Sequence, residues 1–169
     1  MKKVAMFIAF KGFRDEEYAE PKRIMEKSGL KVETISTSKG KAVGKIKITA
    51  DVDKTVDEIN PEDYEILALV GGPGALAELD NEKVRKIFSD FYSKSKPIAA
   101  ICISPVILAH AGLLKGKKAT VWPDGKDELV KNGAIYTANS IEIDSNIITA
   151  NGPLAAKEYG EAILKLISK

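Results

Sequence analysis

The chain has 169 residues, of which 44% are hydrophobic and 30% are charged. This length predicts one domain, residues 1–169, that buries about 70% of the surface exposed by the unfolded chain. The 26 Lys and Arg residues and the 24 Asp and Glu residues give a net charge of +2, which argues against nucleic acid or a membrane as a partner, because both require concentrated positive charge. The single cysteine excludes an intramolecular disulfide and a cysteine-rich metal site, and we expect no metal and no other cofactor.

The apolar segment near the N-terminus predicts a buried strand rather than a signal peptide. Its apolar run, residues 4–10, has seven residues, and Lys11, Gly12 and Arg14 then interrupt it without a small-residue cleavage pattern. We therefore expect a cytoplasmic protein.

Short apolar runs alternate with longer amphipathic segments along the chain. Strands are predicted at 4–10, 32–35, 66–70, 98–101, 119–122, 135–137, 141–143 and 147–150, and helices at 15–28, 81–94, 105–111, 126–131 and 154–167. Residues 40–49 are predicted as a hairpin whose last part, 45–48, alternates polar and apolar residues like a half-exposed edge strand. This order predicts an α/β fold with a mostly parallel sheet and helices on both faces.

Ligands of such sheets bind beyond the carboxyl ends of the strands. The loop after Phe10, the loop 71–74 and Cys102 all follow predicted strands, so we expect them to meet at one rim of the sheet.

Cys102 lies where a buried strand turns into a helix that begins with Pro105. A free cysteine is often an inert buried residue. At a helix N-terminus, however, the dipole and the free N–H groups favour the thiolate, and a strand-to-helix turn exposes the nucleophile of α/β hydrolases. The position therefore favours a reactive cysteine.

The glycine-rich loop 71–74 has two interpretations. It can be a tight turn that needs glycine, or part of an oxyanion hole in which the N–H groups of Gly72 and Ile103 bind a reacting carbonyl oxygen. The spacing fits neither a dinucleotide-binding loop nor a Walker loop.

An acidic cluster begins the first predicted helix. We expect Asp15, Glu16 and Glu20 to be solvated residues that favour the helix dipole. One acid of the cluster could point over the sheet rim toward Cys102, where desolvation and a neighbouring thiolate would raise its pKa. Protonated, it could donate to the sulfur or exchange protons with a substrate.

His110 and Trp122 are the remaining candidates. His110 lies eight residues after Cys102 on the same predicted helix, about 12 Å along its axis, which excludes a direct thiol–imidazole pair within one chain. Trp122 is predicted near the same rim, where it is either a packing residue or a wall of the pocket.

Four stretches together resemble the ThiJ/PfpI (DJ-one/PfpI) superfamily. They are VAMFIAFKGFRDEEYAEP, LALVGGPGA, KPIAAICISPVILAHAGLLKGKKATVWP and NGAIYTANSIEIDSNIITANGP, and they run through nearly the whole chain. The resemblance implies a flavodoxin-like three-layer sandwich of the class I glutamine amidotransferase type, commonly a homodimer or a higher homo-oligomer. It also implies a reactive cysteine at position 102, and it selects Glu17 as the functional acid, four residues before Pro21. The oxyanion donors of the family fall on Gly72 and Ile103, with Gly71 beside them in the binding loop.

The chain departs from the family at its histidines. Ile103 stands where protease-like members carry a histidine after the cysteine, and Trp122 stands where the DJ-one branch carries one. Asn151 also stands where that branch has an arginine that binds anions. These departures argue against proteolysis.

The resemblance leaves three functional hypotheses. The first is an enzyme of glyoxalase or deglycase type, in which Cys102 attacks a small carbonyl compound and Glu17 carries the proton. The second is a redox-responsive stress or chaperone-like protein whose Cys102 is oxidised to the sulfinic acid. The third is a family member without retained chemistry.

Overall fold

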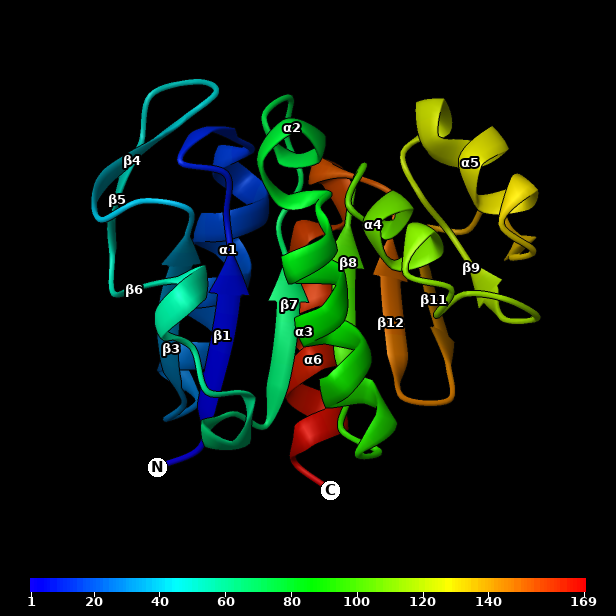
Figure 1. The fold of residues 1–169 in the computed structure, drawn as a ribbon. Helices are drawn as coiled ribbons and strands as arrows, with labels where there is room; N and C mark the ends of the chain where they lie inside the picture. Colours follow the sequence, from blue (N-terminus) through cyan, green and yellow to red (C-terminus); the bar gives the residue numbers. More distant parts are fainter.

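The computed structural model describes residues 1–169 and contains a seven-stranded sheet between two layers of helices (Figure 1). The strand order is β11-β12-β8-β7-β1-β3-β6. Only the outer strand β11 runs antiparallel to its neighbour, β12, and every other pair in this sheet is parallel. The strands are β1 (Lys3–Phe7), β3 (Lys31–Ser36), β6 (Lys54–Thr55), β7 (Ile66–Leu69), β8 (Ile98–Ile101), β11 (Ile141–Asp144) and β12 (Ile147–Ala150). The predicted α/β class with a mostly parallel sheet is confirmed.

The helices divide between the two faces of this sheet. On one face lie α1 (Asp15–Lys27) and α6 (Ala156–Ile167), and on the other lie α2 (Ala75–Leu79), α3 (Glu82–Ser93), α4 (Pro105–His110) and α5 (Lys126–Lys131). Strand β1 shows why both faces are covered: Val4 and Met6 pack into the core of the first face, while Ala5 and Phe7 pack into the core of the second. The fully buried parallel strand is what its continuous apolar run predicted.

Two small sheets accompany the central one. A three-stranded sheet consists of β2 (Lys11–Phe13), β4 (Gly40–Gly44) and β5 (Thr49–Val52), and a two-stranded sheet consists of β9 (Lys118–Ala119) and β10 (Ile135–Tyr136). The predicted edge strand at 45–48 is wrong: these residues form the loop between β4 and β5. The predicted strand at 119–122 is also too long, because Trp122 already begins the turn to a short 3₁₀ helix, Pro123–Gly125.

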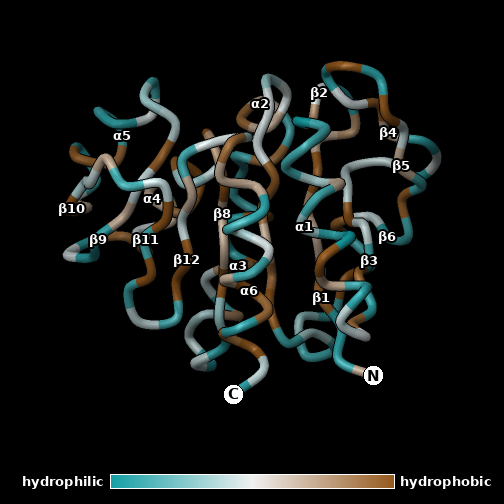
Figure 2. Tube along the Cα trace, turned by 180° about the vertical axis from the view of Figure 1, so that it is seen from behind, coloured by the Kyte–Doolittle hydropathy of each residue, from teal (hydrophilic) through white to brown (hydrophobic).

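The carboxyl ends of the parallel strands meet at the end of the molecule opposite both chain termini (Figures 1 and 2). In Figure 2 the strands are mainly apolar along their length, while polar residues gather on the outer helix surfaces and in the loops. None of the helices has the length and apolar character needed to cross a membrane.

Candidate active site

Cys102 occupies a strained bend between β8 and α4. Its φ angle is +64°, in the left-handed region that costs a non-glycine residue about 1–2 kcal/mol. Two backbone hydrogen bonds hold this bend: the Cys102 N–H donates to the Ala150 carbonyl at 2.9 Å, and the Trp122 N–H donates to the Cys102 carbonyl at 2.7 Å. The buried Ser104 hydroxyl also donates to the Val70 carbonyl at 2.8 Å. The end of β12 and the neighbouring loop segments therefore fix the backbone that presents the thiol.

Glu17 reaches the same point from the first turn of α1. Its side chain has no exposed surface, although it is ionisable. Oε2 accepts a hydrogen bond from the Gly71 N–H at 2.9 Å, while Oε1 has no hydrogen-bond partner. Burial disfavours the charged form and raises the pKa of Glu17 to about 7, against the opposing effects of Cys102, Gly71 and Arg14.

Gly71 lies where the thiol and the carboxyl meet. A Cβ atom at this position would lie 2.5 Å from Cys102 Cβ and 2.7 Å from Glu17 Oε2, so only glycine fits between them. Its N–H is already bonded to Glu17. Gly71 was predicted to belong to the oxyanion-binding loop, but in this structure its N–H is directed at Glu17 and is not free for a ligand.

The N–H groups of Gly72 and Ile103 instead face the Cys102 sulfur and act to lower its pKa. Their effect is smaller than that of burial and of the neighbouring Glu17, which together raise the pKa of Cys102 to about 12. The N–H groups at the helix end therefore favour the thiolate, as expected, but burial and Glu17 outweigh them. Helix α4 has only six residues, and the carboxyl beside the sulfur is itself an anion when ionised.

The thiol and the carboxyl form a coupled pair. With one proton between them, the pair is either a thiol beside a carboxylate or a thiolate beside a neutral carboxyl group, and both forms carry one negative charge. Glu17 can therefore take the thiol proton at the moment that the sulfur forms a bond to a substrate.

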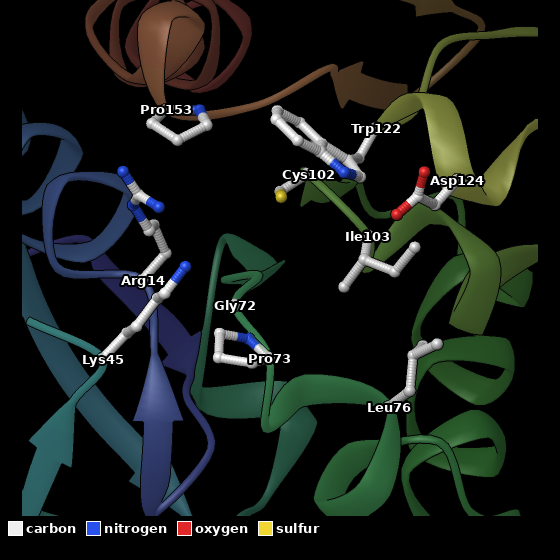
Figure 3. A pocket seen from close by; sticks show the side chains of 10 residues that line it. All are labelled: Arg14, Lys45, Gly72, Pro73, Leu76, Cys102, Ile103, Trp122, Asp124 and Pro153. Atoms are coloured by element: carbon white, nitrogen blue, oxygen red, sulfur yellow. The ribbon is translucent and has the colours of Figure 1, made fainter.

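A pocket of about 350 Å³ opens above this pair (Figure 3). Figure 3 shows Cys102 between two walls, with Arg14 and Lys45 on one side and Trp122 and Asp124 on the other. Its complete lining is Arg14, Lys45, Gly72, Pro73, Leu76, Cys102, Ile103, Trp122, Asp124 and Pro153. Trp122 lies in the pocket wall with 41% of its surface exposed, which is the second of the two alternatives open from the sequence.

Sequence reasoning missed Arg14, Lys45 and Asp124 as pocket residues. Arg14 directly precedes the acidic cluster, and Asp124 follows Trp122-Pro123. Both are neighbours of predicted site residues, and this proximity in the sequence could have indicated that they line the pocket. No sequence feature indicated that Lys45 lies at the pocket, because it reaches the site only when the β4–β5 loop packs against α1.

The acids around Glu17 have separate roles. Glu16 pairs with Arg14, and Glu20 pairs with Arg23, both near the surface as predicted. Asp15 was also predicted to be solvated, but it is only 6% exposed. Its carboxylate accepts hydrogen bonds from the N–H groups of Ile46, Lys47 and Ile48 at 2.8–2.9 Å.

His110 does not line the pocket. It forms hydrogen bonds to Asp80 at 2.6 Å and to Glu128 at 2.7 Å, and so links the end of α2 with α4 and α5. Burial alone would lower the pKa of His110, but the bonds to Glu128 and Asp80 outweigh it and raise this pKa. Its role is structural. No three His, Cys, Asp or Glu side chains are grouped as a metal site.

Comparisons with known proteins agree with this geometry. The model of the DJ-1/PfpI family matches residues 2–166. An uncharacterized protein of Methanocaldococcus jannaschii is 47% identical over 99% of this chain and 83% of its own length. A protein of Pyrococcus horikoshii named a deglycase is 31% identical over 96% of this chain and 98% of its own length.

The solved structures show the same fold. A ThiJ/PfpI domain protein from Brachyspira murdochii superposes with a TM-score of 0.95 at 26% identity, covering 98% of this chain and 96% of that protein. Such a superposition over nearly the whole chain also supports the flavodoxin-like sandwich. The chain belongs to the DJ-1/PfpI family.

Proposed function

We propose that this protein is a cysteine-dependent enzyme that acts on small carbonyl compounds, as a glyoxalase or a deglycase. The observation that carries the proposal is the Cys102–Glu17 pair, in which a thiol on a strained bend lies beside a buried carboxyl group whose pKa is about 7. A general base is most effective when its pKa lies near the working pH. Relatives named deglycases, at about 31% identity, support the same reaction class.

The geometry suggests the following reaction with methylglyoxal. The Cys102 sulfur attacks the aldehyde carbon, its proton passes to Glu17, and the carbonyl oxygen develops negative charge beside the N–H groups of Gly72 and Ile103. Glu17 returns this proton to the oxyanion, which gives the neutral hemithioacetal and restores the carboxylate. The carboxylate then takes the proton from the former aldehyde carbon and delivers it to the neighbouring carbon, which converts the hemithioacetal into a lactoyl thioester. Water hydrolyses the thioester, so one methylglyoxal and one water give one lactate and the free thiol returns.

A deglycase needs one step before these. The substrate is the adduct of the aldehyde with an amine or a thiol, and its carbon–nitrogen or carbon–sulfur bond breaks while the hydroxyl proton passes to the leaving amine or thiol, which restores the aldehyde. Cys102 then attacks this aldehyde as above, and the products are lactate and the released amine or thiol. Proteolysis is disfavoured, because the only histidine, His110, is bonded to Asp80 and Glu128 away from the pocket.

Lactate formation from methylglyoxal tests this proposal. We expect a measurable rate that disappears in Cys102→Ala and falls about 10²–10⁴-fold in Glu17→Gln, the usual contribution of a positioned general base. Equal rates in the wild type and in Cys102→Ala would refute the enzyme.

The pH profile gives a second measurement of the same reaction. Only the form of the pair that holds one proton is reactive. As the pH drops through about 7, the pKa of Glu17, both groups become protonated, so kcat/KM should fall. A profile that is flat from pH 5 to pH 9 would contradict the role of Glu17.

A redox-responsive function is the second candidate, and the donors around the sulfur favour it. Peroxide would oxidise Cys102 to the sulfinic acid in two steps, each releasing one water, and the N–H groups of Gly72 and Ile103 could then bind the sulfinate oxygens. Mass spectrometry after mild peroxide treatment distinguishes the candidates. Two oxygen atoms added at Cys102, without lactate formation, would favour the redox role.

A further inference from the structure

The pocket is larger than the smallest substrates require. At roughly 30 Å³ per non-hydrogen atom, as in liquid water, a three-carbon aldehyde fills less than half of the 350 Å³ above Cys102. The remaining space lies between the two walls of the pocket, and the charges of these walls decide what can occupy it.

One wall is basic. Lys45 and Arg14 both line it, on the side of Cys102 opposite Trp122 (Figure 3). Arg14 forms an ion pair with Glu16 at 2.7 Å, whereas Lys45 forms none. The pocket therefore contains one cation without a protein partner.

The position of Lys45 is fixed by the backbone around it. Its own N–H donates to the Phe13 carbonyl at 2.8 Å, and the N–H groups of the next three residues bind the buried Asp15 carboxylate. The β4–β5 loop is thus tied to the beginning of α1, next to Arg14. These contacts hold the backbone of Lys45 beside the pocket, from which its side chain reaches the lining.

The opposite wall is acidic. Asp124 lines it beside Trp122 and, like Lys45, forms no ion pair. Below both walls lies the Cys102–Glu17 pair, which carries one negative charge when it holds one proton. A negatively charged substrate group is therefore repelled by Asp124 and by the pair, and is attracted only toward Lys45 and Arg14.

We propose that Lys45, assisted by Arg14, binds a carboxylate of the substrate, and that the pocket selects carbonyl compounds or their adducts that carry one carboxylate. Free glycated amino acids have this chemistry, whereas glycated residues within a protein chain lack the α-carboxylate. The proposal rests on the proposed function for the reaction itself, but the charge recognition is a property of the pocket that can be measured without turnover.

Alkylation of Cys102 provides that measurement. Iodoacetate and iodoacetamide are nearly equal in size and differ by one negative charge, and the chain has a single cysteine, so every alkylation reports this site. The ratio of the two rates cancels any change in the thiolate fraction. We expect Lys45→Gln to lower the iodoacetate-to-iodoacetamide ratio about twofold to fivefold, the size of one exposed charge pair.

Lys47→Gln is the matched control. Lys47 is an exposed lysine of the same loop that does not line the pocket, so its loss removes the same net charge. We expect its ratio to remain at the wild-type value. An unchanged ratio in Lys45→Gln, or an equal fall in both variants, would overturn the proposal.

Turnover gives the second test. The hemithioacetals of methylglyoxal with N-acetylcysteine and with N-acetylcysteine amide differ only in the carboxylate, and the wild type should prefer the first by about twofold to fivefold in kcat/KM. This preference should disappear in Lys45→Gln and remain in Lys47→Gln, whose lysine does not line the pocket. If no substrate is turned over but the alkylation ratio still falls in Lys45→Gln, the proposed reaction fails and the carboxylate site stands. Turnover without a preference overturns the carboxylate site alone.

Discussion

Glu17 combines complete burial with one unsatisfied carboxyl oxygen, an arrangement that costs stability when the group is ionised. A structural role does not explain it, because a leucine or a glutamine would be less costly at this position. The arrangement is explained if the carboxyl group exchanges a proton with Cys102. Function and stability are thus opposed at this residue.

Glu17→Gln should therefore stabilise the protein above neutral pH. The folded-state pKa of about 7 lies above the ordinary value of 4.5, so the stability associated with protonated Glu17 is complete below pH 4.5 and is lost as the pH rises to about 7. At 1.36 kcal/mol per pKa unit, the difference between variant and wild type above pH 7 is about 3 kcal/mol at most. Urea unfolding at pH 5 and at pH 8 measures it, and a variant that is less stable than the wild type at pH 8 would contradict this prediction.

At the residue scale, the sequence was sufficient to select Glu17 from the acidic cluster but not to predict its effect on Cys102. The spacing to Pro21 in a family resemblance identified it, whereas helix periodicity alone could not. The raised pKa of Cys102 could not be predicted, because it depends on the buried distance between two side chains that are 85 positions apart in the sequence.

At the scale of elements, the contact between Asp15 and the β4–β5 loop accounts for the clearest error of the sequence analysis. Residues 45–48 alternate like an edge strand, but the N–H groups of Ile46, Lys47 and Ile48 donate to a carboxylate and not to a neighbouring strand. A local pattern cannot reveal a partner that lies about 30 positions earlier in the chain. The same contact places Lys45 at the pocket.

Asp15→Asn should destabilise the fold by about 2 kcal/mol, the range for hydrogen bonds to a charged group. Burial alone would raise the pKa of Asp15, but the three backbone N–H groups outweigh it and lower this pKa. The stability that they provide is present above the ordinary value of 3.8 and is lost as the pH falls through the lower folded-state pKa.

Thermal unfolding of Asp15→Asn and the wild type checks this at two pH values. The difference in Tm should be largest near pH 7 and should shrink as the pH falls below 3.8. Equal Tm values at pH 7 would show that the loop is not held by this carboxylate.

For the whole molecule, the alternation of short strands and helices was sufficient to predict the layers. Strand β1 is buried on both faces, and its uninterrupted apolar sequence already required helices on both sides. The small sheets were predicted in part: the hairpin at 40–49 corresponds to the antiparallel pair β4 and β5, and the strand at 135–137 to β10. Strand β2 was missed, since its three residues carry little pattern of their own. A homodimer or a higher oligomer remains a prediction from the family resemblance.

The rim of the sheet was predictable for a related reason. Parallel strands align their carboxyl ends, so Gly72 and Cys102 had to lie near one another once their strands were recognised. The position of Lys45 in the basic wall could not be predicted, because it comes from the β4–β5 loop outside the central sheet.

The claim that Glu17 and Cys102 share a proton is tested most directly by titrating the Cys102 thiol in the wild type and in Glu17→Gln. Ultraviolet absorbance or pH-dependent alkylation measures the thiolate fraction. In the wild type the thiolate should form only at high pH, toward the pKa of about 12 that burial and the ionised Glu17 impose. In Glu17→Gln the thiol pKa should fall toward the free-thiol value of about 8.5, because the neighbouring negative charge is gone. Identical titration curves in the two proteins would show that Glu17 and Cys102 do not share a proton, and would contradict the account.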